Sequence, residues 1–499
     1  MSLLGIDVGT TGCKAAAFSE DGICLASTYR EYEILHSRPD WAELDSQEVL
    51  TLVKSSIAEV AAQTGKDPIT ALSVSSMGEA MTPVTKDRKI LKNCILSSDI
   101  RGGEYIESLS KEIDQQSFYE INPNILGLNY SLPKLLWLRQ YDPECYAKTY
   151  KFLLWGDLIT FMLGGKAVTS YSLANRTLFF DIRKEDWSDK LLTINKISRE
   201  KLPKPVPSGT IAGTVSNRIA KELNLDSGVK IVVGGHDQCC NSLGAGIYEA
   251  GTAVCGIGTF ECITPTYNHI PDSSLMIKNG LNIEHHVLPN LFVSFIYNQA
   301  GSLVRWFRDT FASADKKIIK DGDDIYERLS NEMPVEPSNL LVLPYFEMTG
   351  PPDFVSDASG VIVGLKTSTT RGEILKAIME CITFYFADSL NALGEIGIDT
   401  SEFVATGGGA KSSHWLQIKA DIFGIPFVRP CITEASILGA AILAGISTGV
   451  FKDPEEGVRC FVKRDAIFEP NSTRHKIYLE KLEKYRELFP LLKDFLLSS

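Results

Sequence analysis

Three patterns that commonly bind nucleotides or metals are missing from this chain of 499 residues. The sequence has no G-x-x-x-x-G-K-[ST] phosphate-binding loop and no G-x-G-x-x-G dinucleotide-binding turn. It also has no H-E-x-x-H zinc-binding helix. These absences remove support for P-loop phosphoryl transfer and for hydride transfer on a Rossmann fold. Any nucleotide site must therefore be built from other residues.

The chain also lacks C-x-x-C pairs, long apolar runs and an excess of basic residues. Its 11 cysteines are scattered singly apart from the neighbours Cys239 and Cys240, so neither a zinc site nor a disulfide framework is indicated. No apolar run approaches the roughly 20 residues of a membrane helix. We expect no secretory signal, because the first residues lead straight into the strand at Leu3 without a basic region, an apolar stretch and a cleavage site. A net charge of −12 argues against a nucleic-acid partner. We expect a soluble, cytoplasmic protein without nucleic-acid or membrane partners.

The length and two similar turns predict two domains. A chain of 499 residues is longer than one hydrophobic core usually supports. The segments "LLGIDVGTTGCKAAAF" (3–18) and "GTAVCGIGTFECITP" (251–265) both place Gly-Thr between apolar strands, which is a weak internal repeat. Because each segment opens about half of the chain, we expect two domains of similar plan, 1–246 and 247–499, that face each other.

The first of these turns has an aspartate at its entrance. Asp7 ends the first apolar strand and is followed by the hydroxyls of Thr10 and Thr11. The N–H groups of a tight glycine turn can form a concave anion site. The segment is therefore consistent with binding of a nucleotide phosphate and its metal. By itself it is equally consistent with a hairpin that binds nothing, because Gly-Thr turns are common.

A second aspartate stands at a predicted strand-to-helix turn. Residues 229–233 predict a buried strand and 239–243 predict the start of a helix, so Asp237 lies between the two elements. In α/β sheets, ligands usually sit at such turns beyond the carboxyl ends of strands. Asp237 is thus a candidate catalytic residue, and the alternative is that it only caps the helix.

Later segments add a glycine-rich turn and further helices. "GGGAKSSHW" places three glycines before a predicted helix at 413–423, where a flat ligand can approach the backbone. Apolar runs predict buried helices at 372–393 and 434–445, and the charged stretch after Arg474 predicts an amphipathic covering helix. Together with the two aspartates, these pieces fit phosphoryl transfer from a nucleotide to a hydroxyl.

With these pieces in this order, the chain resembles the FGGY carbohydrate kinases of the actin, hexokinase and heat-shock ATPase superfamily. "GIDVGTTGCK" and "GTAVCGIGTFE" look like the two phosphate motifs of the family, and "TGGGAKSSHWLQIKADIFGIPF" with "EASILGAAILAG" looks like its adenosine motif. "GVIVGLKTSTTRGEILKAIME" looks like its carboxyl-terminal signature. The resemblance implies an α/β fold of two ribonuclease-H-like (actin-like ATPase) domains, with mixed sheets flanked by helices. It places a sugar-binding domain at 1–246, a nucleotide-binding domain at 247–499 and the catalytic cleft between them.

The resemblance also implies roles for particular residues. Asp237 in "GGHDQ" matches the catalytic base, and Asp7 matches the residue that engages Mg²⁺ and the phosphates of ATP. Lys14 is either structural or a distant electrostatic helper. The remaining residues implied to bind the nucleotide are Thr10, Thr11, Gly258, Thr259, Gly408, Gly409 and Ala410.

The sugar end departs from the family pattern. The residues implied to bind substrate are Gly78, Glu79, Asp99, Arg101, Asp237 and Gln238. Gly78-Glu79 stands where xylulose kinases typically show Met-His-Gly and glycerol kinases Arg-Glu, and Ser97 stands where many members carry Trp. Residues 348–350, Met-Thr-Gly, replace a common Gly-Glu-Arg. The sugar, the hydroxyl that is phosphorylated and the effect of residues 348–350 stay open.

These observations predict an ATP- and Mg²⁺-dependent kinase of a small sugar, sugar acid or polyol, with a substrate of ketopentose type favoured. One alternative is a sugar or nucleotide sensor that kept the fold without the chemistry, and another is an ATPase that polymerises or acts on proteins. A metal site at His236, His285 and His286 is not favoured, because a suitably spaced further ligand is missing. The pathway and the oligomeric state are undecided, with a homodimer as one arrangement.

Overall fold

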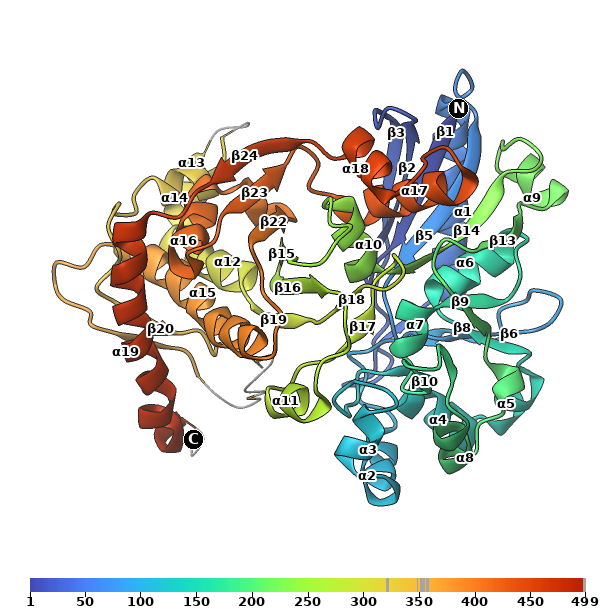
Figure 1. The fold of residues 1–499 in the computed structure, drawn as a ribbon, viewed down its shortest axis with the longest axis horizontal. Helices are drawn as coiled ribbons and strands as arrows, with labels where there is room; N and C mark the ends of the chain where they lie inside the picture. The colour runs from blue at the N-terminus through green and yellow to red at the C-terminus, as the bar shows by residue number, and fades with distance from the viewer. Residues whose placement is uncertain (320–322, 348, 351–354, 356–358, 497–499) are drawn as a thin grey trace.

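Two mixed sheets flanked by helices form the two lobes of the molecule (Figure 1). The computed structural model describes residues 1–319, 323–347, 349–350, 355 and 359–496. The mixed α/β architecture predicted from the sequence is confirmed. Each sheet is centred on one of the two Gly-Thr hairpins.

The first sheet grows on both sides of the first hairpin, in the order β13-β14-β5-β1-β2-β3. Its strands are β1 (Ser2–Val8), β2 (Gly12–Ser19), β3 (Cys24–Glu31), β5 (Ile69–Ser76), β13 (Ile211–Thr214) and β14 (Lys230–His236). β5 runs parallel to both β1 and β14. Every residue of β1 except Asp7 is buried, because helices cover both faces of this central strand.

The second sheet repeats this plan around the second hairpin. Its strands are β15 (Thr252–Ile257), β16 (Phe260–Tyr267), β17 (Glu284–His285), β18 (Phe292–Val293), β19 (Ile296–Gln299), β22 (Glu402–Thr406), β23 (Phe427–Pro430) and β24 (Arg464–Phe468). β15 and β16 are antiparallel, and β22 and β23 continue in parallel beyond β15. β18, β17 and β19 extend the sheet on the β16 side.

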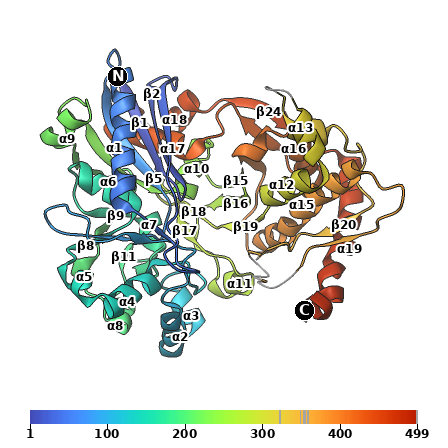
Figure 2. The ribbon, with the colours of Figure 1, turned by 180° about the vertical axis from the view of Figure 1, so that it is seen from behind.

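A helix from the carboxyl-terminal half covers the first sheet. α17 (Ala435–Thr448) packs on β1, β5 and β14 and against α10 (Asp237–Gly244), and α1 (Ser46–Gln63) covers the opposite face, as the view from behind shows (Figure 2). The small residues of α17 permit this close packing: a Cβ at Gly439 would lie 1.9 Å from the carbonyl oxygen of Cys240. The chain therefore returns to the first lobe late in the sequence, and the boundary at 246/247 stays a prediction.

The second lobe contains the other predicted helices. α15 (Arg371–Glu395) begins with a capping box formed by Thr370 and Glu373, which explains why the long apolar run becomes a helix at that point. α16 (Ser413–Phe423) follows the glycine turn, and α19 (Ser472–Leu496) packs against both of these helices. The predicted helices at 372–393, 413–423 and 434–445 are confirmed.

The other elements of the first lobe are β4 (Glu43–Leu44), β6 (Thr82–Val84), β7 (Cys94–Ile95), α2 (Gly103–Glu112), α3 (Gln115–Tyr119), α4 (Ser131–Tyr141), α5 (Pro143–Lys148), β8 (Lys151–Leu153), α6 (Trp155–Leu163), β9 (Val168–Ser170), α7 (Tyr171–Asn175), β10 (Phe180–Asp181), β11 (Asp186–Trp187), α8 (Asp189–Asn195), a 3₁₀ turn (Arg199–Lys201), β12 (Lys204–Val206) and α9 (Asn217–Glu222). Those of the second half are α11 (Ser273–Lys278), α12 (Gly301–Phe311), α13 (Ser313–Ile318), α14 (Ile325–Ser330), β20 (Leu341–Leu343), β21 (Val361–Val363), a 3₁₀ turn (Gly408–Lys411) and α18 (Pro454–Phe461).

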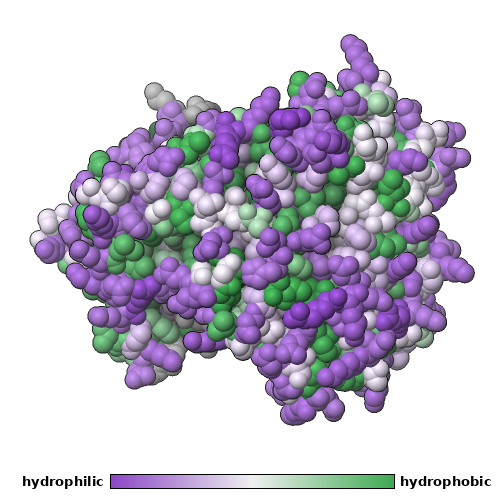
Figure 3. All heavy atoms as spheres, in the orientation of Figure 1, coloured by the Kyte–Doolittle hydropathy of each residue, from purple (hydrophilic) through white to green (hydrophobic). Residues whose placement is uncertain are grey.

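The surface is mostly hydrophilic on the face drawn in Figure 3, with hydrophobic residues scattered among polar ones. Within the described residues, every helix is too short or too polar to cross a membrane. All 11 cysteines carry free thiols, and Cys239 and Cys240 are buried in α10 as predicted.

Candidate active site

The first hairpin holds Asp7 in a half-buried position that is electrostatically unfavourable for its charge. Asp7 accepts a hydrogen bond of 2.7 Å from the hydroxyl of Ser75, and Thr10 and Thr11 are exposed at the turn beyond it. Burial, together with the nearby charge of Asp237, raises the pKa of Asp7 to about 7. Lys14 opposes this shift, although its ammonium group is ion-paired with Glu434. A cation beside Asp7 would relieve the cost of burying its charge.

The second hairpin is joined by its backbone to α12. The N–H of Gly258 donates to the carbonyl of Phe260 at 2.9 Å, and the carbonyls of Gly258 and Thr259 accept from Gly301 and Ser302. Arg305, one turn into α12, approaches the hydroxyl of Thr259 at 3.5 Å. Thr259 is exposed, so its hydroxyl faces solvent or a ligand rather than the core.

A cavity of about 720 Å³ lies between this hairpin and the glycine-rich turn. Its walls include Gly258, Thr259, Gly408 and Gly409, four of the residues predicted to bind the nucleotide. Ala410 is fully buried below the turn and does not line the cavity. The walls also carry charged side chains that sequence reasoning missed, among them Arg305, Lys411 and Arg429. Lys411 stands within the segment "GGGAKSSHW", of which only the glycines and Ala410 were singled out, whereas Arg305 and Arg429 lie outside the quoted motifs.

The two glycines at this cavity differ in what a side chain would contact. A Cβ at Gly409 would lie 2.3 Å from Cγ2 of Ile257, whereas a Cβ at Gly408 would contact no protein atom within 4 Å. We expect Gly409→Ala to destabilise the protein by about 1–3 kcal/mol and to weaken ATP binding, because the turn must shift. Gly408→Ala is the matched control and should leave the melting temperature unchanged. Equal melting temperatures for the two variants would contradict this packing.

Asp237 is the first residue of α10 and follows β14 directly. The register of the sheet sets Asp7 opposite Ser75 and His236 opposite Ser76, so the ends of β1, β5 and β14 meet at one edge. Burial raises the pKa of Asp237; the neighbouring His236 opposes this rise and the carboxylate of Glu79 adds to it. The candidate base therefore lies within electrostatic reach of both Asp7 and Glu79.

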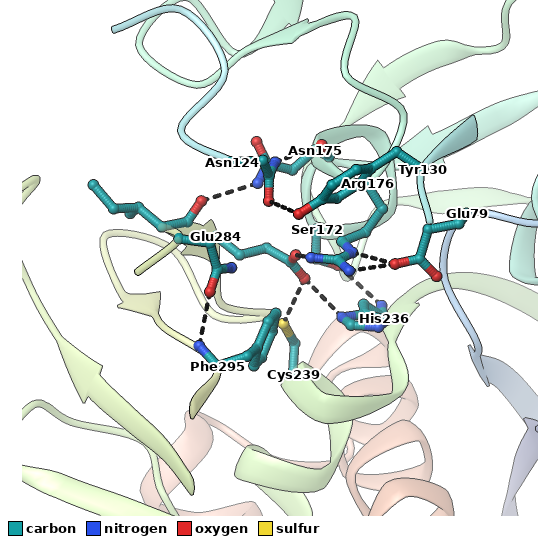
Figure 4. Close-up of polar contacts among 12 residues, drawn as sticks. Glu79, Asn124, Tyr130, Ser172, Asn175, Arg176, His236, Cys239, Glu284 and Phe295 are labelled. Carbon is teal, nitrogen blue, oxygen red and sulfur yellow. Dashed lines mark hydrogen bonds and ion pairs between the residues drawn. The ribbon is translucent and has the colours of Figure 1, made fainter. Parts of the chain in front are cut away.

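Glu79 anchors a cluster of charged side chains beside this edge (Figure 4). Nε of Arg176 donates to Oε1 of Glu79 at 2.6 Å, and Nη1 of Arg176 lies 3.7 Å from Oε2 of Glu284. The guanidinium also lies over the rings of Tyr130 and Phe295, at 4.8 and 5.7 Å from their centres. Arg176 is thus fixed between two carboxylates and two rings.

The backbone around Glu79 is adapted to this cluster. Glu79 has a left-handed φ of +59°, which is unusual for a residue other than glycine and typical of functional sites. A Cβ at Gly78 would lie 3.0 Å from Cγ of Arg176 and 3.3 Å from Cδ2 of His236. Gly78 therefore permits the close approach of the side chains of Arg176 and His236. The last of the residues implied to bind substrate, Gln238, is half-buried next to Asp237.

Asp99 and Arg101 form a separate, saturated cluster. Oδ1 of Asp99 accepts from Nε of Arg101 at 2.9 Å, and Nη2 of Arg101 lies 2.7 Å from Glu43. The guanidinium lies 3.9 Å from the ring centre of Trp41. In the described part of the chain, no hydrogen bond or ion pair joins Asp99 or Arg101 to the Glu79 cluster. These contacts are consistent with a structural role for Asp99 and Arg101. Substrate binding by these two residues stays a prediction.

Sequence reasoning missed Arg176 and Glu284 altogether. His236 was considered from the sequence only as a metal ligand, a role that was not favoured. Of the residues 348–350, Met348 lies outside the described residues, and the carbonyl of Gly350 accepts a hydrogen bond of 2.8 Å from Tyr385.

The N-terminal domain model of the FGGY family of carbohydrate kinases matches residues 2–244, and the C-terminal domain model of the same family matches residues 271–448. The chain belongs to this family. As an FGGY carbohydrate kinase it is a phosphotransferase with an alcohol group as acceptor. Its activity is the ATP-dependent phosphorylation of a sugar or polyol.

Individual relatives agree over almost the whole length. The chain is 28% identical to a xylulose kinase of Bacillus subtilis, over 99% of this chain and 96% of the relative. It is 27% identical to a glycerol kinase of a Geobacillus strain, over 95% of each. The crystal structure of a xylulose kinase from Rhodospirillum rubrum superposes with a TM-score of 0.89 at 24% identity, over 99% of both chains. The two-domain fold implied by the resemblance is confirmed.

Proposed function

We propose that this kinase transfers the γ-phosphoryl group of ATP to a hydroxyl of a small neutral sugar or polyol, a ketopentose being favoured, with Asp237 as general base. The position of Asp237 carries the proposal. It is half-buried directly after β14, where its charge acts on Asp7 on the proposed phosphate side and is acted on by Glu79 on the proposed sugar side. The xylulose kinase among the relatives supports a ketose, although 28% identity leaves the sugar undefined.

The residues around Asp7 fit a magnesium ion. Mg²⁺ prefers carboxylate oxygens and keeps several waters, so one buried carboxylate is sufficient. The raised pKa of Asp7 reflects a carboxylate whose charge is not compensated inside the protein. When bound, Mg²⁺ would neutralise charge on the phosphates of ATP.

The chain's own residues then have distinct tasks. The turn N–H groups and the hydroxyls of Thr10, Thr11 and Thr259 would hold phosphate oxygens, and Gly408 and Gly409 would face the nucleoside. Asp237 would orient the substrate hydroxyl and accept its proton as the phosphoryl group moves, since a loose transition state needs only late proton removal. Approach of the two lobes would exclude water from the reaction.

Arg176 favours a neutral substrate over a sugar acid. Both Nε and Nη2 of Arg176 are bonded to Glu79, and Glu284 lies beside its remaining nitrogen. Its charge is therefore already balanced, and an entering carboxylate would meet the charges of Glu79, Glu284 and Asp237. A hydroxyl, by contrast, can donate to a carboxylate oxygen of Glu79.

The test is ADP release from MgATP with D-xylulose, D-ribulose, glycerol and D-gluconate. We expect turnover with a neutral compound and little with gluconate. Glu79→Gln should lower kcat/KM for the neutral substrate about 10- to 100-fold, because a charged hydrogen bond is lost. The same variant should raise the activity ratio of gluconate to the neutral sugar, since it releases the charge of Arg176. Glu79→Asp, which keeps the charge, is the control for that ratio.

Two outcomes would contradict the proposal. Gluconate as the preferred substrate would show that Arg176 is available to a carboxylate. ATP binding without turnover on any substrate would favour the sensor. A cytoplasmic location and a homodimer stay predictions.

A further inference from the structure

Both ring nitrogens of His236 face carboxylates. Nδ1 lies 2.8 Å from Oε1 of Glu284, and Nε2 lies 3.3 Å from Oδ1 of Asp237. The ring is held on its side by Phe295 in an edge-on contact of 5.3 Å, and the backbone N–H of His236 donates to the hydroxyl of Ser172 at 3.1 Å. Nδ1 is hydrogen-bonded to the carboxylate of Glu284, and Nε2 lies at ion-pair distance from the carboxylate of Asp237, so these two carboxylates together favour the protonated, positively charged form of the ring.

The charged surroundings of His236 agree with this assignment. Glu284 approaches from β17, Asp237 from α10 and Arg176 from the end of α7, and Arg176 is itself bonded to Glu79. Burial alone lowers the pKa of His236, but the carboxylates of Glu284 and Asp237 outweigh it and raise the pKa above its ordinary value. The thiol of Cys239 donates to the same oxygen of Glu284 at 3.3 Å.

Glu284 comes from the other half of the chain. It lies in the region matched by the C-terminal family model, whereas His236 and Asp237 lie in the N-terminal one. Two hydrogen bonds to the backbone of Ile283 nevertheless fix its segment to the first lobe. The side-chain amide of Asn175 donates to the carbonyl of Ile283 at 2.9 Å, and the N–H of Ile283 donates to the carbonyl of Pro123 at 2.9 Å. Glu284 therefore reaches His236 from a segment that is hydrogen-bonded to the first lobe.

We propose that Glu284 and His236 are positioning residues for the general base: Glu284 orients the imidazolium, and the imidazolium holds Oδ1 of Asp237 so that Oδ2 faces the substrate. This inference rests on the proposed function. In the transfer step, the sugar O–H bond breaks and its proton moves to Oδ2 of Asp237. The sugar oxygen forms a bond to the γ-phosphorus, the bond to the bridging oxygen of ADP breaks, and His236 keeps both of its protons.

The same side chains do not favour a metal ion. Within the described residues, His236, Cys239 and Glu284 are grouped with their ligand atoms within 4.8 Å of one another. Hydrogen bonds from His236 and Cys239 already occupy Oε1 of Glu284, and Arg176 lies beside Oε2. A cation would have to displace these contacts next to a guanidinium.

The kinetic test compares His236→Leu, His236→Gln and Glu284→Gln with the original enzyme on the sugar that it turns over best. We expect His236→Leu to lower kcat about 100-fold and to change either KM less than about threefold. His236→Gln keeps an N–H donor, so its kcat should be at least about tenfold higher than that of His236→Leu. His269→Gln, which removes an exposed histidine, is the control and should retain full activity.

The pH profile separates positioning from a merely structural role. The base must be ionised, so activity falls on the acid side as pH drops through the pKa of Asp237. Removing the imidazolium raises that pKa, so the acid limb of kcat should move upward by about one pH unit in His236→Gln. In Glu284→Gln the shift should have the same direction and be smaller, because the carboxylate of Glu284 itself raises the pKa of Asp237. An unmoved limb, or a kcat of His236→Leu within threefold of the original enzyme, would overturn the proposal.

A measurement without turnover makes the two proposals separable. Ring ¹⁵N spectra of the seven histidines, with His236 assigned from the His236→Gln variant, report its protonation directly. We expect both nitrogens of His236 to stay protonated at pH 7 and Glu284→Gln to abolish this. A neutral His236 at pH 7 overturns the inference even if the enzyme is active. Absence of sugar-dependent turnover with a charged His236 overturns the proposed function instead.

Discussion

The Asp237→Asn variant is expected to lose at least about 100-fold in kcat, while its Kd for MgATP changes less than about threefold. Asparagine has the same shape but an amide group, so it cannot take the proton of the substrate hydroxyl. The contact to Nε2 of His236 at 3.3 Å can be kept by the amide oxygen, so the local structure should survive. Calorimetric titration with MgATP and steady-state kinetics on the same preparation check both statements.

Two results would contradict this expectation. A kcat near that of the original enzyme would show that Asp237 is not the base. A large loss of ATP affinity would place Asp237 at the phosphates instead. Ser172→Ala serves as a control for local packing, because the Ser172 hydroxyl is hydrogen-bonded to the backbone N–H of His236 and to the hydroxyl of Ser170.

The Lys419→Met variant should lose about 3–5 kcal/mol of stability. Lys419 in α16 and Glu261 in β16 are both fully buried, and Nζ lies 2.6 and 2.7 Å from the two carboxylate oxygens. Removing the lysine leaves the carboxylate buried without its counter-charge, and the thiol of Cys255 at 3.3 Å cannot replace it. Because β16 forms part of the second Gly-Thr hairpin, which we propose binds a phosphate of ATP, ATP affinity should fall as well.

Urea unfolding and a companion double variant test this prediction. Lys419→Met with Glu261→Gln removes both charges and should recover most of the lost stability. Lys148→Met removes an exposed pair with Glu144 and should cost less than about 0.5 kcal/mol. If Lys419→Met cost as little as Lys148→Met, the buried pair would not be holding α16 on the second sheet.

The elements that we propose hold the phosphates of ATP could be predicted from the sequence because their signals are local. Gly-Thr between two apolar runs specifies a hairpin, and an apolar run followed by "GGHDQ" specifies β14 and the start of α10. The three helices of the second half follow from long apolar stretches with caps or glycines at their ends.

The sugar end could not be predicted in the same way. Glu79 and Arg176 are 97 positions apart, and Glu284 lies 48 positions from His236, so no local pattern connects them. His236 was visible beside Asp237, but the only role weighed for it from the sequence was that of a metal ligand, which was not favoured. Its partner Glu284 lies on a different strand and gives no local signal. The packing of α17 on the first sheet could not be predicted either, because an apolar sequence alone does not indicate which sheet a helix covers.

The most direct measurement is the stoichiometry of products formed from MgATP and the preferred neutral sugar. Mass spectrometry of the sugar phosphate and an enzymatic assay of ADP would be run on the same time course. We expect one sugar phosphate for each ADP, no ADP without sugar, and neither product with Asp237→Asn above a few per cent of the original rate. ADP formed without sugar phosphate, or at the same rate without sugar, would contradict a sugar kinase that uses Asp237 as its base.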